Sequence, residues 1–380
     1  MDIKDFNSGT WQSGYDFKYF VPSFINHEWS FTDTRILELL EKASINLGEL
    51  NSFTRYVPDI ELFTQSYVMK EAVTSSRIEG TRTNMEEAFY SETDIEPEKR
   101  DDWNETLSYS KAMYYAIDAL KTLPLSSRLI KQTHRVLLTN VRGKHKNPGE
   151  FRTSQNWIGG INIKDAVFVP PKAELIGELM SDLEYFLHND RISVPRLIKI
   201  AIGHYQFETI HPFLDGNGRV GRLLITLYLI SEGVLDKPLL FTSAIFEKYK
   251  TLYYEKLTFV REKNDLSGWI RFFLEVVTET SSEAILLMKR IIDLRESCTA
   301  IILDKFGRKA AIAHKFLDYL FRKPVVYNAD SKEYLQISTK SMNNLLDDFI
   351  KAGILEEITG YKRNRKYIFR QYIDILRKEY

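Results

Sequence analysis

Twelve consecutive residues hold the side chains best suited to chemistry in this sequence. They read HPFLDGNGRVGR and run from His211 to Arg222. A histidine such as His211 can act as a base near neutral pH, and the carboxylate of Asp215 can hold a hard divalent cation. Gly216 and Gly218 let the backbone approach a phosphate closely, with N–H groups facing the anion. The run therefore combines a base, a cation ligand and an anion-facing backbone.

Two arginines complete this run. Arg219 and Arg222 are three residues apart, so they project from one side of the helix that is expected to begin here. Guanidinium groups match phosphate oxygens in pairs, and a helix N-terminus attracts anions. The spacing therefore predicts an anion site with a base beside it, and each of these residue types has a distinct role if the anion is a nucleoside triphosphate. The alternative is a polar capping loop in which His211 and the arginines only satisfy nearby carbonyls.

The run also resembles a known family. It matches the HxFx(D/E)GNGRxxR signature of the Fic (filamentation induced by cAMP) family at every fixed position. The resemblance implies a protein adenylyltransferase, in which His211 deprotonates a Tyr, Thr or Ser hydroxyl that attacks the α-phosphate of ATP. Asp215 would anchor Mg²⁺. The residues that it assigns to ATP in this loop are Gly216, Asn217, Gly218, Arg219, Val220, Gly221 and Arg222.

A second motif lies upstream. Residues 75–80 read SSRIEG and match the (S/T)xxxE(G/N) inhibitory motif of the same family, with Ser75 first, Glu79 as the glutamate and Gly80 last. A carboxylate paired with Arg222 would withdraw that arginine from the γ-phosphate and repel the phosphate as well. The resemblance therefore implies autoinhibition within one chain. The alternative is a helix end with a solvated glutamate.

The base of the nucleotide has one candidate partner. Tyr254 follows Tyr253 on a predicted helix and resembles the family's position for base contacts. Paired tyrosines on a helix are also common in protein cores. His204 is expected to be buried rather than to bind a metal.

Other functions stay open on the same residues. The chain can be a different nucleotidyl or phosphate transferase, or an enzyme that removes AMP. It can also be a nucleotide-sensing regulator that binds DNA. The expected partner is a protein substrate, the chain itself included, and a homodimer stays open.

Hydrophobic spacing predicts a mainly α-helical fold around these motifs. Residues 1–30 are rich in aromatic side chains without a clear period, which favours an extended arm over a helical body. The expected helices begin at residue 33 and after residue 58, then cover 106–120, 127–138, 172–187, 195–208, 218–231, 243–261, 267–303, 310–321 and 342–352.

One segment interrupts the helices before the phosphate loop. Paired glycines and β-branched residues between 156 and 169, ended by two prolines, predict a small hairpin. It can be a structural cover or an exposed strand edge, from Ile161 to Val169, that captures an extended peptide. The Fic family has a hairpin flap at this place, so the resemblance favours target binding.

The C-terminal part predicts a winged helix, which resembles the module attached to many Fic proteins. Two helices would precede strands at 354–358 and 366–369. The basic run at 362–366 could contact DNA phosphates, but Asp347 and Asp348 on the expected recognition helix would repel them. A protein-contact role is therefore favoured over DNA binding. The expected domains are a helical region with the inhibitory motif (1–105), a Fic catalytic core (106–306) and the winged helix (307–380).

Bulk properties restrict the class of protein. The 380 residues have a formal net charge of zero, which argues against a protein built mainly to coat nucleic acid. The single cysteine, Cys298, fits a reducing compartment. The first residues show no secretory signal, and no apolar run approaches the length of a membrane span. A cytoplasmic location without membrane attachment is therefore expected.

Overall fold

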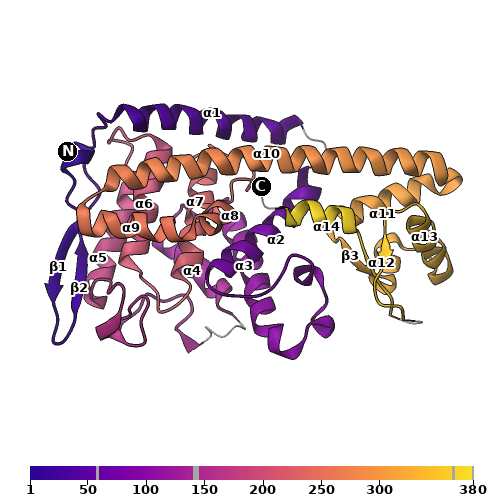
Figure 1. Ribbon diagram of the computed structural model, residues 1–380, viewed down its shortest axis with the longest axis horizontal. Coiled ribbons are helices and arrows are strands. Elements are labelled where there is room, and N and C mark those ends of the chain that lie inside the picture. Colours follow the sequence, from indigo (N-terminus) through magenta and orange to yellow (C-terminus); the bar gives the residue numbers. More distant parts are fainter. Residues whose placement is uncertain (57–59, 140–144, 362–363, 379–380) are drawn as a thin grey trace.

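The computed structural model describes residues 1–56, 60–139, 145–361 and 364–378. Helices dominate it, as predicted (Figure 1). In the described part of the chain, none of the helices has the length and apolar character needed to cross a membrane. The helices are α1 (Thr34–Tyr56), α2 (Ile60–Ile78), α3 (Arg100–Ala119), α4 (Ser127–Leu137), α5 (Ile176–His188), α6 (Arg196–Ile210), α7 (Asn217–Ser231), α8 (Ser243–Lys248), α9 (Lys250–Lys263), α10 (Leu266–Lys305), α11 (Ala310–Arg322), α12 (Asn328–Leu335), α13 (Thr339–Lys351) and α14 (Arg370–Arg377).

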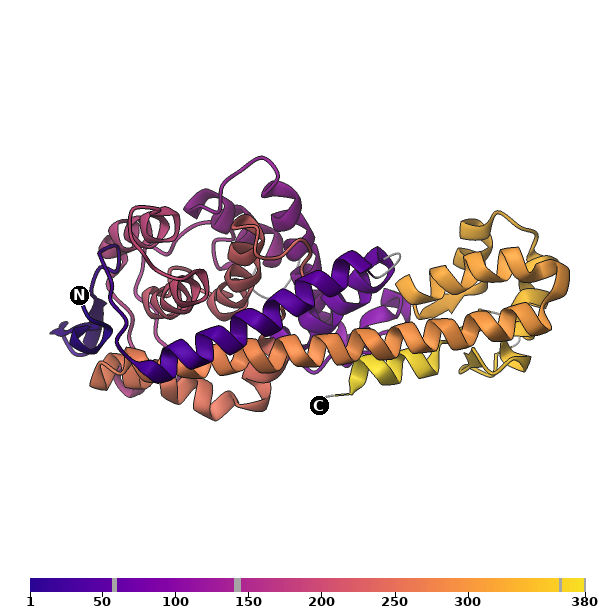
Figure 2. The same cartoon turned by 90° about the horizontal axis from the view of Figure 1, so that it is seen from above.

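The N-terminal arm contains a hairpin that was not predicted. Strands β1 (Gly9–Ser13) and β2 (Lys18–Pro22) pair antiparallel, with Trp11 opposite Phe20. Gly9 has a φ of +144°, and a Cβ there would lie 2.2 Å from the carbonyl oxygen of Val21, so the strand pairing requires glycine at this position. The chain then enters α1, which runs beside the long helix α10 (Figure 2).

Helices α6 and α7 form the centre of the helical body. They pack on each other, and α5, α10, α3 and α4 surround them. Every α6 residue from Leu197 to Ile210 is buried. Apolar side chains on all sides of a helix require burial on all sides, so the loop between α6 and α7 is held by two rigid elements.

The helix predicted over 243–261 is two helices. Helix α8 ends at Lys248, Tyr249 leaves the helical region with φ −108° and ψ 34°, and α9 begins at Lys250. The N–H of Tyr249 still donates to Ile245, and its carbonyl still accepts from Tyr253. The backbone of Tyr249 is therefore bonded to both helices, although the chain leaves the helical conformation at this residue.

The segment predicted as a hairpin is mostly a turn. Ile158 and Phe168 form an isolated antiparallel bridge, and Ile163–Asp165 is a 3₁₀ turn. Asn162 and Asp165 accept backbone N–H groups inside this turn, which draws the backbone away from strand pairing. The predicted strand edge from Ile161 to Val169 is therefore wrong at its centre. Residues 151–171, which contain this turn, are called the flap.

The C-terminal part is a helix–strand–helix–helix–hairpin series. Strands β3 (Val325–Tyr327), β5 (Lys366–Ile368) and β4 (Glu356–Glu357) form one antiparallel sheet in that order. Strand β3, α12 and α14 were not predicted, since each is only three to eight residues long. The winged helix stays a prediction for this series. Part of the predicted basic run, residues 362 and 363, lies outside the described residues.

Candidate nucleotide site

A six-residue loop joins the two central helices. Helix α6 ends at Ile210, and His211 adopts a left-handed conformation with φ 50° and ψ 60°. Gly216 is also left-handed, with φ +76°, immediately before α7 begins at Asn217. Two reversals of this kind bring the imidazole and the N-terminus of α7 into one short loop, where the unpaired N–H groups of a helix start attract an anion.

Asn217 and His134 hold this loop. The amide of Asn217 accepts the N–H of Phe213 and donates to its carbonyl, both at 2.8 Å. The His134 ring stacks on Phe213 at 3.7 Å between centroids. Its Nδ1 accepts the N–H of Gly149, so its Nε2 carries the proton and donates to the carbonyl of Asp215 at 3.0 Å. In this structure the Asn217 amide bonds to the loop itself. Sequence spacing gave no sign of His134.

His211 is neutral at physiological pH in this environment. Burial and then the positive charge of Arg152 lower the pKa of His211 to about 4. Its Nδ1 is buried and has no hydrogen-bond partner among the described residues. A neutral imidazole can accept a proton, so the predicted base has the protonation state that it needs.

Arg222 contacts Ser75 and Glu79, the two polar residues at fixed positions of the upstream motif. Its Nε donates to the hydroxyl of Ser75 at 2.8 Å, and its Nη2 donates to the carbonyl of Ser75 at 2.9 Å. The same Nη2 lies 2.7 Å from Oε1 of Glu79. The Arg222 side chain is 1% exposed and that of Glu79 is 35% exposed. The motif and the arginine, 143 residues apart, therefore form one polar cluster.

The Glu79 carboxylate lies against the start of α7. A Cβ on Gly218 would meet Oε1 of Glu79 at 2.3 Å. Burial raises the pKa of Glu79, but the charge and hydrogen bond of Arg222 outweigh burial and hold it below its usual value. Gly80, with φ +102°, ends the helix behind it. A negative group thus occupies the anion-attracting helix terminus.

Arg219 is paired on another side of the loop. Its Nη1 lies 3.1 Å from Glu105 of α3, and its Nη2 lies 3.6 Å from Oδ1 of Asp215. Arg219 is 3% exposed. Glu105 precedes Arg219 by 114 residues and belongs to no motif, so only the tertiary structure could reveal it.

Asp215 has one oxygen available for a cation. Its Oδ1 accepts the N–H of Gly216 at 2.6 Å, and its side chain is 42% exposed. Among the described residues, no cluster of three or more acidic, His or Cys side chains could bind a metal. Mg²⁺ is commonly held by one or two carboxylates together with substrate phosphates and waters. The residues present therefore fit Mg²⁺ bound jointly with a nucleotide.

Val220 and Gly221 point into the helix packing. Val220 is 2% exposed, and its N–H donates to the carbonyl of Gly216. A Cβ on Gly221 would lie 2.1 Å from Oε1 of Glu208, so this glycine allows α6 to approach. Burial raises the pKa of Glu208 to about 7. Both residues shape the loop from behind rather than presenting a side chain to a ligand.

Of the two adjacent tyrosines, Tyr253 lies in the core and Tyr254 lies at the surface. Tyr253 is buried, and its hydroxyl bonds to Nε2 of the buried His204 at 2.9 Å, as expected for a packed histidine. Tyr254 is 42% exposed. Burial and then the charge of Glu79 raise the pKa of Tyr254 to about 12, so its ring lies within electrostatic range of Glu79.

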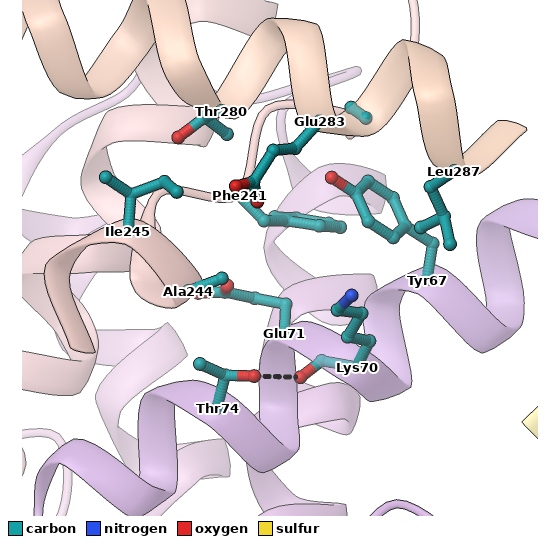
Figure 3. Close-up of a pocket in the computed structure, with 11 residues that line it drawn as sticks. Tyr67, Lys70, Glu71, Thr74, Phe241, Ala244, Ile245, Thr280, Glu283 and Leu287 are labelled. Carbon is teal, nitrogen blue, oxygen red and sulfur yellow. Dashed lines mark hydrogen bonds between the residues drawn. The ribbon is translucent and has the colours of Figure 1, made fainter. Parts of the chain in front are cut away.

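A small cavity lies behind α2. It has a volume of about 20 Å³, enough for one water molecule. Figure 3 shows Glu71 and Thr74 of α2 facing Ala244 and Ile245 across it. Glu71 accepts hydrogen bonds from Tyr109 and Ser243, and burial raises the pKa of Glu71 to about 7. The cavity therefore belongs to the packing that holds α2 and is no substrate site.

Together these features define a phosphate-handling site in a helical protein: a glycine-capped helix start, a neutral histidine and two buried arginines. Residues 37–118 match the Fic/DOC family N-terminal model, and residues 124–229 match the Fic/DOC family model. These residues of the chain therefore belong to the Fic/DOC family.

Named relatives and solved structures agree with this family. Proteins named "Protein adenylyltransferase Fic" from Drosophila grimshawi and Drosophila yakuba are 31% and 30% identical over 185 residues, which is 47% of this chain. The match spans 34% of each relative, about a third of its length. A Fic family protein from Desulfovibrio desulfuricans has a similar fold, with a TM-score of 0.58 at 19% identity over 90% of this chain and 98% of that one. Fic-1 from C. elegans has a TM-score of 0.52 at 19% identity over 67% of this chain and 74% of that one.

Proposed function

We propose that this chain transfers AMP from ATP to a hydroxyl group of a protein and that Glu79 restrains the transfer. One observation carries the proposal: the neutral His211 lies in the same short loop as the glycine-capped start of α7. A base and an anion site within one six-residue loop suit the activation of a hydroxyl beside a phosphate. The names of the relatives supply the nucleotide and the class of acceptor.

The proposed reaction is a single displacement at phosphorus. His211 takes the proton of a Tyr, Thr or Ser hydroxyl while the oxygen attacks the α-phosphorus. The bond from this phosphorus to the oxygen bridging to the β-phosphate breaks, and pyrophosphate leaves with its electron pair. The product is a phosphodiester between AMP and the acceptor side chain, and the base keeps one proton to return to solvent.

The loop residues bind and orient ATP in this proposal. Backbone N–H groups at the start of α7 face the phosphates. Asp215 would hold Mg²⁺, which would neutralise phosphate charge. Arg222 binds the γ-phosphate once it is released from Glu79, and Tyr254 lies near the base.

Inhibition follows from the same contacts. Glu79 occupies the side of Gly218 and Arg222 that a γ-phosphate needs, and its charge repels phosphate. ATP then binds weakly or with its α-phosphate misplaced relative to His211. Two groups at the C-terminal end of α2, the Ser75 hydroxyl and the Glu79 carboxylate, compete with the nucleotide for one guanidinium.

Mass spectrometry tests the proposed function. The Glu79→Gly chain is incubated with Mg-ATP, alone and with cell lysate, and the expected product is an added AMP on a hydroxyl side chain. The Glu79→Gly, His211→Ala chain should lose about 100 to 10,000-fold in rate, the usual contribution of a general base. Parallel incubations with GTP, CTP and UTP establish which nucleotide is used. AMP transfer at an equal rate without His211, or no transfer from any nucleotide, contradicts the proposal.

A further inference from the structure

Arg152 is a buried cation that bonds only to backbone among the described residues. It is 2% exposed, although it lies in the flap. Its Nε donates to the carbonyl of His211 at 3.0 Å, and its Nη1 donates to that of Ser154 at 3.1 Å. Its Nη2 reaches the carbonyls of Pro171 and Ile210. One guanidinium therefore joins four points of the chain.

These four points belong to three parts of the site. Ile210 is the last residue of α6, His211 is the proposed base, and Ser154 and Pro171 lie near the two ends of the flap. The backbone N–H of Arg152 also donates to the carbonyl of Pro212 at 2.9 Å. The side chain and the main chain of Arg152 therefore bond to the carbonyls before and after that of His211.

The turn at His211 needs hydrogen bonds of this kind to fix its conformation. His211 has φ 50°, a region that residues with side chains adopt only where surrounding bonds fix it. Asn156 gives a second bond to the same carbonyl at 3.4 Å and one to Phe213 at 2.8 Å. Arg152 supplies the shorter bond and the only charge in this pair, so it dominates the placement of the turn.

We propose that Arg152 is the positioning residue of the proposed base: its guanidinium fixes the turn that aims His211 and joins this turn to the flap. The inference rests on the proposed function only in treating His211 as the base. A planar fork with several donors is needed to reach diverging carbonyls, and a lysine ammonium cannot reproduce it. The hydrogen bonds of Arg152 then couple the flap to the base, so a displacement of one also displaces the other.

The charge of Arg152 gives a second, independent readout. Four groups facing His211 affect its protonation: Arg152 and Arg261 disfavour the imidazolium, and Glu79 and the Glu208 carbonyl favour it. Removing the positive charge at 152 should raise the pKa of His211 from about 4. The acid limb of a pH–rate profile reports a base that must be unprotonated, so this limb should move to higher pH.

Two substitutions separate geometry from charge. In the Glu79→Gly chain, Arg152→Lys keeps a charge without the fork, and Arg152→Gln removes both. Both should lower kcat for AMP transfer to the chain itself by about 100-fold, the effect expected of a displacement near 1 Å. The KM for ATP should change less than about threefold, because the anion site is intact. Only Arg152→Gln should shift the acid limb upward.

A matched control removes a different buried cation. Lys199 of α6 is 5% exposed and donates to the carbonyl of Asn189 at 3.0 Å, at the end of the helix far from the loop. Lys199→Gln should keep kcat and the acid limb. An equal loss of kcat in Lys199→Gln, or wild-type kcat in Arg152→Gln, overturns the inference.

A measurement without turnover separates this inference from the proposed function. The ring protons of His211, assigned with the His211→Gln chain, are titrated by NMR in the Arg152 variants. A raised pKa of His211 in Arg152→Gln, with displaced ring signals in both variants, supports positioning even if no AMP transfer exists. An unchanged pKa and unchanged signals overturn it.

Discussion

Ser75 and Glu79 contact a single guanidinium, and this contact explains their spacing. Residues four apart lie on one face of a helix, so the hydroxyl of Ser75 and the carboxylate at the end of α2 both reach Arg222. The residues between them need not contact it. The partial exposure of Glu79 weakens the ion pair relative to a fully buried one, because solvent screens it.

Glu79→Gly should therefore activate the chain, by roughly tenfold. A charge-assisted hydrogen bond contributes about 1.5–3 kcal/mol, and partial exposure reduces this figure, while each ~1.4 kcal/mol is tenfold in rate. Radiolabelled AMP transfer and ATP affinity by calorimetry provide the measurement. Both should increase.

The double substitution is the matched control. Glu79→Gly with Arg222→Ala should show no activation, since the arginine that the first change releases is absent. Unchanged transfer and ATP affinity in Glu79→Gly alone would reduce Ser75 to Gly80 to an ordinary helix end.

Among the elements, the flap is shaped by the hydrogen bonds of its turn rather than by strand pairing. The N–H of Val167 donates to the carbonyl of Ile158, so this donor is already used inside the flap. The carbonyl of Val169 accepts from Phe20 of β2, and Lys164 lies 2.9 Å from Asp16. The N-terminal hairpin thus borders the flap and limits where an extended peptide can pair.

Gly160→Ala should impair the flap selectively. Gly160 has φ +73°, and a Cβ there would lie 2.4 Å from the carbonyl oxygen of Asp165. The turn must rearrange, so AMP transfer to protein should fall severalfold while ATP affinity stays within about twofold. Transfer assays and calorimetry compare the two.

Gly177→Ala serves as the control. Gly177 lies in α5 with nothing within 4 Å of an added Cβ, so its replacement should leave both quantities unchanged. If Gly160→Ala lowers transfer and ATP affinity equally, the flap acts as a structural cover and not as a target-binding element.

In the whole molecule, the C-terminal helices pack on α2, the helix that precedes Glu79. Helices α11 and α14 both contact α2. The hydroxyl of Ser66 donates to the carbonyl of Phe321 at 3.0 Å, and the rings of Phe63 and Phe321 meet edge to face at 5.7 Å. Figure 1 shows α14 beside α2, at the junction of the two halves.

Glu86 ties the segment after Glu79 to the same C-terminal part. It accepts hydrogen bonds from Arg370 and Arg377, both at 2.7 Å, and its side chain is 14% exposed. Glu86→Ala should lower the free energy of unfolding by about 2 kcal/mol, as for lost charge-assisted hydrogen bonds. Urea denaturation measures this loss, and Glu98→Ala, exposed in the same segment, should cost almost nothing.

The stabilisation by Glu86 should depend on pH. Burial raises the pKa of Glu86, but bonds from Tyr90 and Arg370 outweigh burial and lower it below 4.5. A carboxylate with a lowered folded-state pKa stabilises the fold above its unfolded pKa and loses this effect as pH falls. The difference between Glu86→Ala and the parent chain should therefore shrink below about pH 4.5. A difference that stays constant down to pH 3 contradicts the assignment.

The sequence by itself determined the helical class, the limits of most long helices and the chemical content of the loop from His211 to Arg222. These features depend on hydrophobic period and on residues adjacent in the chain, both of which are local. The mainly α fold and the family are confirmed. The roles of the site residues stay proposals.

Tertiary structure alone decided which distant groups meet. Glu105, His134 and Arg152 approach the loop from other elements, and no spacing along the chain encodes those approaches. Short elements such as β1, β3 and the flap turn also escaped prediction, because a few residues carry too little periodic signal and their hydrogen bonds are made with distant segments. The protonation state of His211 was likewise decided only in the folded chain, since burial beside a cation lowers its pKa.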